Sequence, residues 1–114
     1  MRSRTPLVFR AISDTTRRAI LDRLTTRPLT VNEIARAFPI SRPAISRHLR
    51  LLRRAKLVAE KREGRRRIYR LNPSPLKAID DWVSRYRLFW GATLIDLKEF
   101  VERDAAAGSS GDQT

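Results

Sequence analysis

Residues 30–54 read TVNEIARAFPISRPAISRHLRLLRR, and this stretch decides the fold. Thr30 and Glu33 have the spacing of a capping box, in which the Thr hydroxyl accepts from the amide of Glu33 and the Glu carboxylate reaches back to the amide of Thr30. The helix that they begin ends at Pro39, because proline lacks a backbone donor and clashes with the preceding turn. A second helix follows after a short link. This arrangement predicts a helix-turn-helix.

The second helix begins after Ser41, whose side chain suits the N-cap, and extends to Ala55. At about 100° per residue, Ile45, Leu49 and Leu52 share one side of it. The opposite side carries Pro43, Ser46, Arg47, Arg50 and Arg54. A helix about 10–12 Å across fits the major groove of B-DNA, which is about 12 Å wide, and arginine can bond both acceptors of guanine there. We call this segment the reading helix.

The period changes after the reading helix. Residues 57–62 and 67–71 flank Glu63-Gly64-Arg65, where Gly64 suits a positive backbone φ. This pattern predicts a β-hairpin. A basic hairpin beside a reading helix forms a wing, which lies along the phosphates or enters the minor groove.

Three more helices complete the expected fold. The first lies at residues 7–12, the second follows Asp14 as its N-cap, and the last follows Ser74 as its cap. The fold class is therefore mainly α with a β-hairpin wing, a winged helix-turn-helix with four helices before the hairpin and one after it. The expected parts are one DNA-binding domain over residues 1–104, a dimerisation helix over about 75–104, and a disordered tail over 105–114.

Positive charge is concentrated in the reading helix and the wing. The 114 residues include 25 Lys and Arg against 12 Asp and Glu, and residues 42–70 hold 12 of the basic residues but only Glu60 and Glu63. Such a one-sided excess in a folding sequence indicates a polyanionic partner, with nucleic acid ahead of anionic membrane. The lack of cysteine excludes disulfides and thiolate sites and fits a cytoplasmic location. No apolar run approaches the roughly 20 residues of a membrane span, so we expect no membrane partner.

The last helix carries an apolar stripe with steps of three and four residues. It consists of Leu76, Ile79, Val83, Tyr86, Trp90, Leu94, Leu97 and Val101. About 29 continuous residues would reach roughly 43 Å, far beyond the radius of gyration of about 13 Å for a domain of this size. The overhanging apolar surface predicts a homodimer interface formed by the residues of the stripe from Leu76 to Leu97. An effector pocket lined by Trp82, Tyr86, Phe89 and Trp90 is the alternative use of these aromatics.

Residues 8 to about 104 resemble the ArsR/SmtB-type winged-helix repressors of prokaryotes. The matching stretches are VFRAISDTTRR at 8–18, SRPAISRHL at 41–49, LV at 57–58 and REGRRRIYRL at 62–71. The family commonly has Pro at the position of Thr15 and Gly at that of Lys56. The resemblance implies a homodimer that binds an inverted-repeat operator and represses transcription, with autoregulation as a role that the family suggests.

The metal sites of that family's founding members do not carry over. Those sites use cysteines on the helix before the reading helix, or Asp and His on the last helix. Here residues 33–37 hold no cysteine and the last helix holds no histidine. His48 is the single histidine, and it is expected to be packed and hydrogen-bonded beside the buried side of the reading helix, within reach of a phosphate. We expect no metal and no cofactor, and the effector ligand, if there is one, is unknown.

The predicted function is sequence-specific binding of double-stranded DNA by a homodimeric transcriptional repressor with a palindromic operator. The residues assigned to base reading are Ser41, Arg42, Pro43, Ser46, Arg47 and Arg50, and those assigned to phosphate or wing contacts are His48, Arg54, Arg62, Arg65, Arg66 and Arg67. The alternative is a basic RNA- or ribosome-binding module without operator specificity. The lack of an aromatic stacking platform on the hairpin argues against this alternative. With one histidine, no cysteine and no glycine-rich phosphate loop, the chain is predicted not to be an enzyme.

Overall fold

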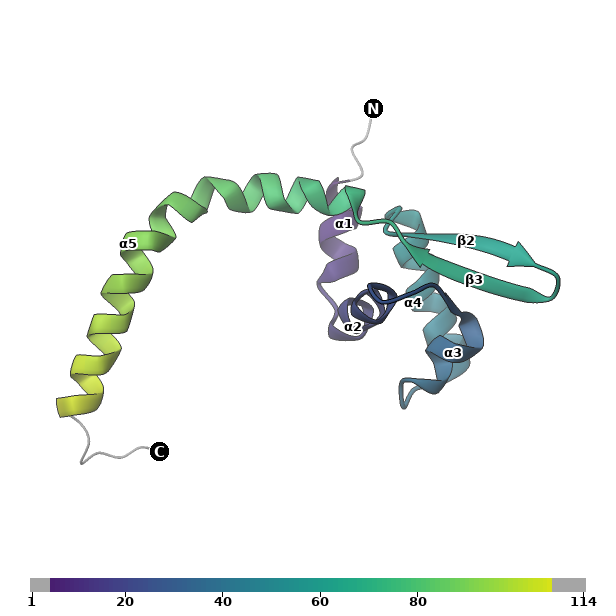
Figure 1. Cartoon of the computed structure of the whole chain (residues 1–114), viewed down its shortest axis with the longest axis horizontal. Coiled ribbons are helices and arrows are strands. Elements are labelled where there is room, and N and C mark those ends of the chain that lie inside the picture. The colour runs from purple at the N-terminus through teal and green to yellow at the C-terminus, as the bar shows by residue number, and fades with distance from the viewer. Residues whose placement is uncertain (1–4, 108–114) are drawn as a thin grey trace. The chain divides into compact units, whose positions relative to one another are not determined.

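The computed structural model describes residues 5–107, except for the side chains of residue 5, residues 92–96 and residues 106–107. The chain forms two units, residues 1–79 and residues 80–114. The elements in chain order are α1 (Thr5–Ile12), α2 (Thr15–Leu24), β1 (Leu29–Thr30), α3 (Val31–Arg36), α4 (Arg42–Arg54), β2 (Val58–Glu63), β3 (Arg66–Leu71), the 3₁₀ helix η1 (Ser74–Leu76) and α5 (Lys77–Ala107) (Figure 1). This is the winged helix-turn-helix that the sequence predicts.

Side chains cap α2, α3 and α4 as expected. Asp14 and Ser41 each accept a hydrogen bond from the backbone N–H three residues further on, at 2.9 and 3.2 Å. The Thr30 hydroxyl accepts from the backbone N–H of Glu33 at 3.1 Å, and the Glu33 carboxylate accepts from the backbone N–H of Thr30 at 2.8 Å. The capping box is thereby confirmed. These bonds satisfy backbone donors that have no partner within a helix.

The core of the first unit forms where α1, α2 and α3 pack against α4. The predicted stripe of α4 lies at its centre, with Ile45, Leu49 and Leu52 at most 1% exposed. The other large, fully buried side chains are Val8, Ile20, Ile34 and Leu57. The opposite side of α4 therefore faces away from the core.

The sheet has three strands in the order β1-β3-β2. The hairpin is confirmed, with six-residue strands and Gly64 at φ +63° in the turn. The short strand β1 was not predicted. It pairs Leu29 with Tyr69 and Thr30 with Ile68. Two residues are too few to show an alternating pattern, so this strand is visible only through its partner.

The link from α4 to the wing is a Schellman turn centred on Lys56. The Leu57 N–H donates to the carbonyl of Leu52 and the Lys56 N–H to that of Arg53, both at 2.9 Å. Lys56 has φ +65°, in the left-handed region that glycine adopts at no steric cost. The family that the sequence resembles commonly has Gly at this position, and the positive φ is the structural reason for it. Lys56 adopts the same conformation, so α4 ends where a glycine would end it.

The start of the last helix differs from the prediction. Ser74 was expected to cap it, but no side chain caps η1, and α5 begins only at Lys77. Asn72 is the polar residue that organises this corner, because its amide donates to the Lys56 carbonyl at 2.8 Å and its side-chain oxygen accepts from the Ser74 backbone N–H at 3.3 Å. A residue before the turn, rather than one within it, makes these bonds.

Helix α5 is continuous through Gly91. It ends at Ala107, three residues beyond the expected boundary at residue 104. Residues 108–114 of the expected tail lie outside the described part of the chain.

Replacing Lys56 by glycine is expected to stabilise the protein. The left-handed conformation costs a residue with a Cβ about 1–2 kcal/mol, while glycine adds about 0.5–1 kcal/mol of unfolded-state entropy, so Lys56→Gly should gain about 0.5–1 kcal/mol. For a domain of this size the melting temperature should rise by about 2–8 °C. Calorimetry at one protein concentration measures it.

Lys56→Ala is the matched control, because it removes the same charge and keeps the strained φ. An equal gain in both variants would show that relief of charge repulsion, and not backbone strain, is the cause.

Candidate nucleic-acid interface

The side of α4 that faces away from the core carries the residues predicted to read bases. Ser46 is half-buried, and the exposed members of the set are Ser41, Arg42, Pro43, Arg47 and Arg50. Arg47 and Arg50 form no ion pair within the described part of the chain, so their guanidinium groups stay open to an incoming acceptor. Planar guanidinium forks of this kind suit paired acceptors on a base edge or a phosphate.

A hollow of about 280 Å³ lies between α3 and the turn end of the wing, with Arg42 at the start of α4 in its lining. Its basic lining consists of Arg36, Arg42, Arg65, Arg66 and Arg67. The structure thus brings Arg42, a predicted base-reading residue, beside three of the predicted wing cations. Arg36 at the end of α3 was not predicted, although it lies about 200° around that helix from the buried Ile34. The helical period therefore contained the signal for it.

A second hollow, of about 510 Å³, lies between the end of α4 and the start of the wing. Its charged lining consists of Arg50, Arg53, Arg54, Lys56 and Glu60. Arg50, predicted to read bases, and Arg54, predicted to contact phosphate, both line this hollow. Arg53 and Lys56, for which the sequence predicted no role, line it as well. The C-terminal half of α4, with Arg50, Arg53 and Arg54, is therefore more basic than its N-terminal half, with Arg42 and Arg47.

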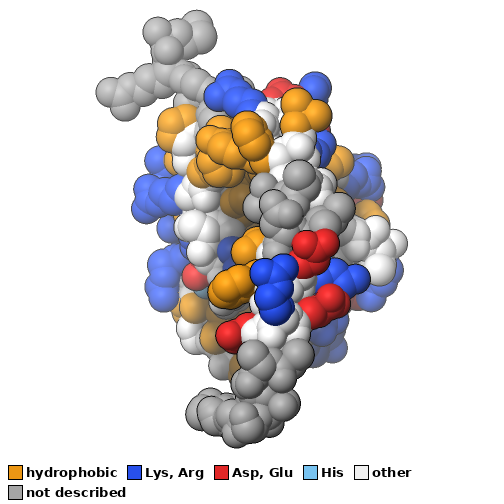
Figure 2. Space-filling model, turned by 90° about the vertical axis from the view of Figure 1, so that its left-hand side faces the viewer, with side chains coloured by type: hydrophobic (Ala, Val, Ile, Leu, Met, Phe, Trp, Pro, Cys, Tyr) orange, Lys and Arg blue, Asp and Glu red, His pale blue; other side chains and the backbone are white. Residues whose placement is uncertain are grey.

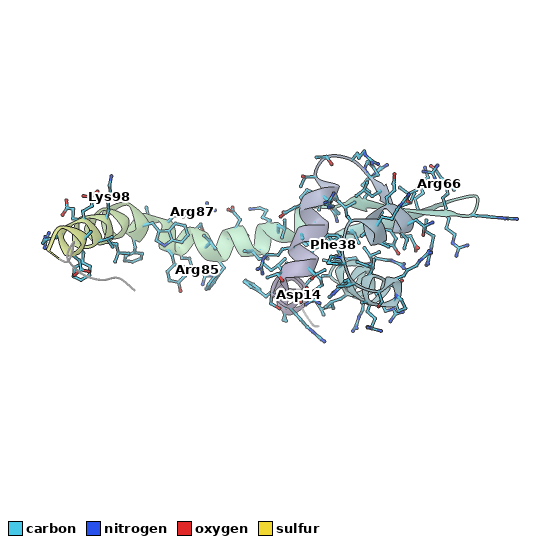
Figure 3. All side chains as sticks on the ribbon, turned by 90° about the horizontal axis from the view of Figure 1, so that it is seen from below. Asp14, Phe38, Arg66, Arg85, Arg87 and Lys98 are labelled. Carbon is cyan, nitrogen blue, oxygen red and sulfur yellow. The ribbon has the colours of Figure 1, made fainter. Side chains whose placement is uncertain are left out.

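The pleat of the wing divides its cations between two faces. Arg62 pairs with Arg67, two positions beyond the Glu60–Tyr69 pair, so these four residues share one face. Arg66 belongs to the opposite face and lines a separate hollow with Lys61 and Arg70. Arg65 is in the turn. Figure 3 shows Arg66 on the projecting hairpin, beyond the helices.

His48 is hydrogen-bonded within the protein and is not fully buried. Its side chain is 21% exposed, and Nδ1 lies 3.2 Å from an Arg17 guanidinium nitrogen and 4.0 Å from Asp14 Oδ2. Arg17 also donates to the carbonyl oxygens of Ala11 at 2.7 Å and Arg10 at 3.0 Å. These bonds tie α4 to the corner between α1 and α2 and fix the ring of His48.

Glu60 joins the wing to α4. Its Oε1 lies 3.1 Å from an Arg53 guanidinium nitrogen, and its Oε2 lies 3.5 Å from one of Arg67. The Tyr69 hydroxyl donates to Oε2 at 3.3 Å. Burial raises the pKa of that hydroxyl above its usual value, and the Glu60 carboxylate raises it further. Arg67, predicted to contact phosphate, is thus already paired within the protein.

The predicted interface stripe changes its surroundings along the last helix. Leu76 and Ile79 are partly buried against the core of the first unit. In the second unit Val83 is half-buried, whereas Tyr86, Trp90 and Leu97 are 44–53% exposed. The side chain of Leu94 lies outside the described part. The face drawn in Figure 2 carries hydrophobic side chains in groups.

Within the described residues, no three His, Cys, Asp or Glu side chains gather as metal ligands would. The same part of the chain has no helix that combines the length and the apolar character needed to cross a bilayer.

Comparison with known proteins places this geometry in a family. A family model described as a helix-turn-helix domain matches residues 12–61. The chain is 41% identical over 106 residues to the HTH-type transcriptional regulator Rv2034 of Mycobacterium tuberculosis, covering 93% of this chain and 91% of the relative. It is 42% identical to the transcriptional repressor SdpR of Bacillus subtilis, covering 69% and 88%. The crystal structure of an ArsR family transcriptional regulator, RHA00566, has a TM-score of 0.70 and 29% identity, covering 78% and 98%.

The Asp14 cap is expected to make stability depend on acidic pH. The backbone N–H of Arg17 donates to the Asp14 carboxylate and holds its pKa below the usual value. The cap's ionic contribution is therefore complete above the unfolded-state pKa of about 3.9 and is lost as the pH falls through the lower, folded-state value. Asp14→Ala should reduce the free energy of unfolding by about 1 kcal/mol at pH 7.

Urea titrations of the two proteins between pH 7 and pH 2.5 measure the difference. The gap should narrow at the acidic end. A gap that stays constant over the whole range would show that the charge of Asp14 adds nothing to the cap.

Proposed function

The chain belongs to the ArsR-type family of winged helix-turn-helix transcriptional regulators, and from this premise we propose that it is a homodimeric repressor that binds a palindromic operator. Its relatives are transcriptional regulators, which supports a DNA-binding regulator and argues against an enzyme. We further propose which residues read the DNA, how two copies pair and how binding affects transcription.

The exposed, unpaired arginines on the outer side of α4 carry this proposal. The buried stripe turns Arg47 and Arg50 away from the core, onto a helix narrow enough for the major groove. We assign Ser41, Arg42, Pro43, Ser46, Arg47 and Arg50 to base reading. Arg47 and Arg50 are the guanine contacts in this scheme, because each guanidinium can bond both guanine acceptors.

Phosphate contacts are assigned to His48 and Arg54 of α4 and to the arginines of the wing. We assign His48, Arg54, Arg62, Arg65, Arg66 and Arg67 to these contacts, and we add Arg36 because it lines the same hollow as Arg42. Phosphate contacts carry little sequence information, but they hold the protein in register on the duplex.

The exposed stripe on α5 supports the dimer. Buried aromatic side chains each remove about 150–250 Å² from water, and here Tyr86 and Trp90 stand 45% and 44% exposed in the single chain. We assign Leu76, Ile79, Val83, Tyr86, Trp90, Leu94 and Leu97 to the interface, with α5 from about residue 75 to 104 as the dimerisation helix. A twofold dimer presents two α4 helices to half-sites one DNA turn apart, about 34 Å.

Occupation of a promoter by such a dimer blocks transcription. The similarity to the repressor SdpR supports this output, and repression of its own promoter is the simplest circuit. Selection of bound duplexes from a random pool tests the proposal. It should return an inverted repeat with half-site centres about 10 base pairs apart. Preference for structured RNA over every duplex in the same competition would favour the RNA-binding alternative.

Arg50 should contribute to sequence preference, whereas Arg66 should contribute to affinity for any duplex. Arg50→Ala should cost about 1–3 kcal/mol at one operator position and relax the preference there. Arg66→Ala should weaken binding to all duplexes alike and reduce the magnitude of the salt slope by about one. Fluorescence anisotropy titrations with operator and random duplexes at several salt concentrations measure both. Equal losses on the two duplexes for both variants would contradict this division of roles.

A charge in the α5 stripe should separate the dimer. Leu97→Glu places a carboxylate where the partner packs, so the protein should sediment as a monomer at micromolar concentration and lose operator affinity.

Leu88→Glu is the matched control, since Leu88 is 89% exposed and lies about 180° around α5 from the stripe. It should leave sedimentation and binding unchanged. A monomeric wild-type protein, or equal effects of the two variants, would contradict the assigned interface.

A further inference from the structure

Glu60 is an acidic side chain held inside a basic surface. Residues 42–70 contain two acidic residues, and they differ in their surroundings. Glu63 lies at the end of β2 and its side chain is 51% exposed, and within the described part of the chain its ion pair is with Lys61 of its own strand, at 3.7 Å. Glu60 is 15% exposed and contacts cations from two other elements, Arg53 of α4 and Arg67 of β3.

Glu60 lies where the wing leaves the core, one position short of the outermost pair between β1 and β3, Thr30 with Ile68. Its register partner is Tyr69, which is 4% exposed and belongs to the core. From there outward the hairpin loses core contact, and residues 61–66 are all exposed. The outer part of the wing therefore depends on what fixes its base. Apolar packing holds the core side of that base, and among the described residues the Glu60 carboxylate makes the ion pair that joins the wing to a side chain of α4.

Taken alone, the negative charge of Glu60 opposes DNA binding. A carboxylate on this surface repels phosphates and neutralises part of the charge of Arg53 and Arg67. Simple electrostatics therefore predicts that its loss strengthens binding to any duplex. Any benefit of Glu60 to DNA binding must therefore come from the geometry that it imposes. The bonds that neutralise the two arginines also hold the wing and α4 in one arrangement.

We propose that Glu60 is a positioning residue for operator recognition, which clamps the wing to the C-terminal part of α4 so that both reach the duplex in one register. The inference rests on the proposed function. Glu60 lowers affinity for random DNA and raises the ratio of operator affinity to random-DNA affinity. Arg53 and Arg67 are its two attachment points, and Tyr69 orients its carboxylate.

Three variants separate the charge from the position. Glu60→Gln keeps the size and an acceptor for Tyr69 but removes the charge. Glu60→Asp keeps the charge, but its side chain is one methylene too short to hold both arginines. Glu63→Gln removes one negative charge from the same strand without touching the clamp. Operator and random duplexes are titrated by fluorescence anisotropy over a range of salt concentrations, with circular dichroism as the check of folding.

Glu60→Gln should bind random DNA about two- to five-fold more tightly, with a salt slope steeper by about one, while its specificity ratio falls about tenfold. Glu60→Asp should lose a similar part of the ratio without the gain on random DNA. Glu63→Gln should gain equally on both duplexes and keep the wild-type ratio. If Glu60→Asp matches the wild type and Glu60→Gln matches Glu63→Gln, Glu60 acts only through its charge and the proposal is wrong.

A measurement without DNA separates this proposal from the proposed function. The chain has no cysteine, so Arg65→Cys at the wing tip and Asp22→Cys on the exposed side of α2 accept a pair of spin labels. The distance distribution between them should broaden with Glu60→Gln and Glu60→Asp but not with Glu63→Gln. An unchanged distribution overturns the clamp even if operator binding is found. A broadened one in a protein without operator preference supports the clamp and rejects the repressor.

Discussion

Burial of one side of α4 is the constraint on which the rest of this structure depends. Ile45, Leu49 and Leu52 are at most 1% exposed, and burial of each such side chain contributes about 1.5–3 kcal/mol. Rotation of the helix by half a turn would expose these aliphatic groups and bury unpaired arginines, at a cost of several kcal/mol for each charge. The outward direction of Arg47 and Arg50 is therefore a consequence of core packing. It does not depend on contacts that the two arginines make themselves.

The same core places the wing. The Schellman turn at Lys56 ends α4 and directs the chain into β2, and Asn72 closes the loop from the other side by donating to the Lys56 carbonyl. Tyr69 then buries its ring in the core while its hydroxyl meets Glu60. Each link starts from a residue that the core holds, so the wing inherits its position from α4 up to the Glu60–Tyr69 pair.

Periodicity and local chemistry were sufficient to predict most of the fold. Caps such as Thr30 with Glu33, the α4 stripe and the turn at Gly64 depend on residues within a few positions of one another, and the structure confirms all three. Contacts over long sequence distances could not be predicted in this way. Strand β1 requires β3 as its partner.

The placement of the candidate site was predictable to a similar degree. Helical spacing indicated which side of α4 is exposed, but it could not show that Arg67 is occupied by Glu60. The division of the wing cations between two faces follows from alternation once the register is known, and the register depends on where the turn falls. The failure of Ser74 as a cap has the same origin, since the residue that organises this corner is Asn72, whose amide donates to the carbonyl of Lys56, 16 residues earlier.

The apolar stripe of the last helix bears on the proposed pairing of two copies. Its apolar stripe keeps the same period across the boundary between the two units, yet only its first residues, Leu76 and Ile79, pack against the core. Beyond that point the period continues through Tyr86, Trp90 and Leu97, which the single chain leaves about half exposed. In the proposed dimer a second copy covers this stripe, because a twofold axis brings the same apolar residues together from both chains. The proposed pairing would also set the spacing of two α4 helices, and so would link the apolar stripe of α5 to the half-site spacing of the proposed operator.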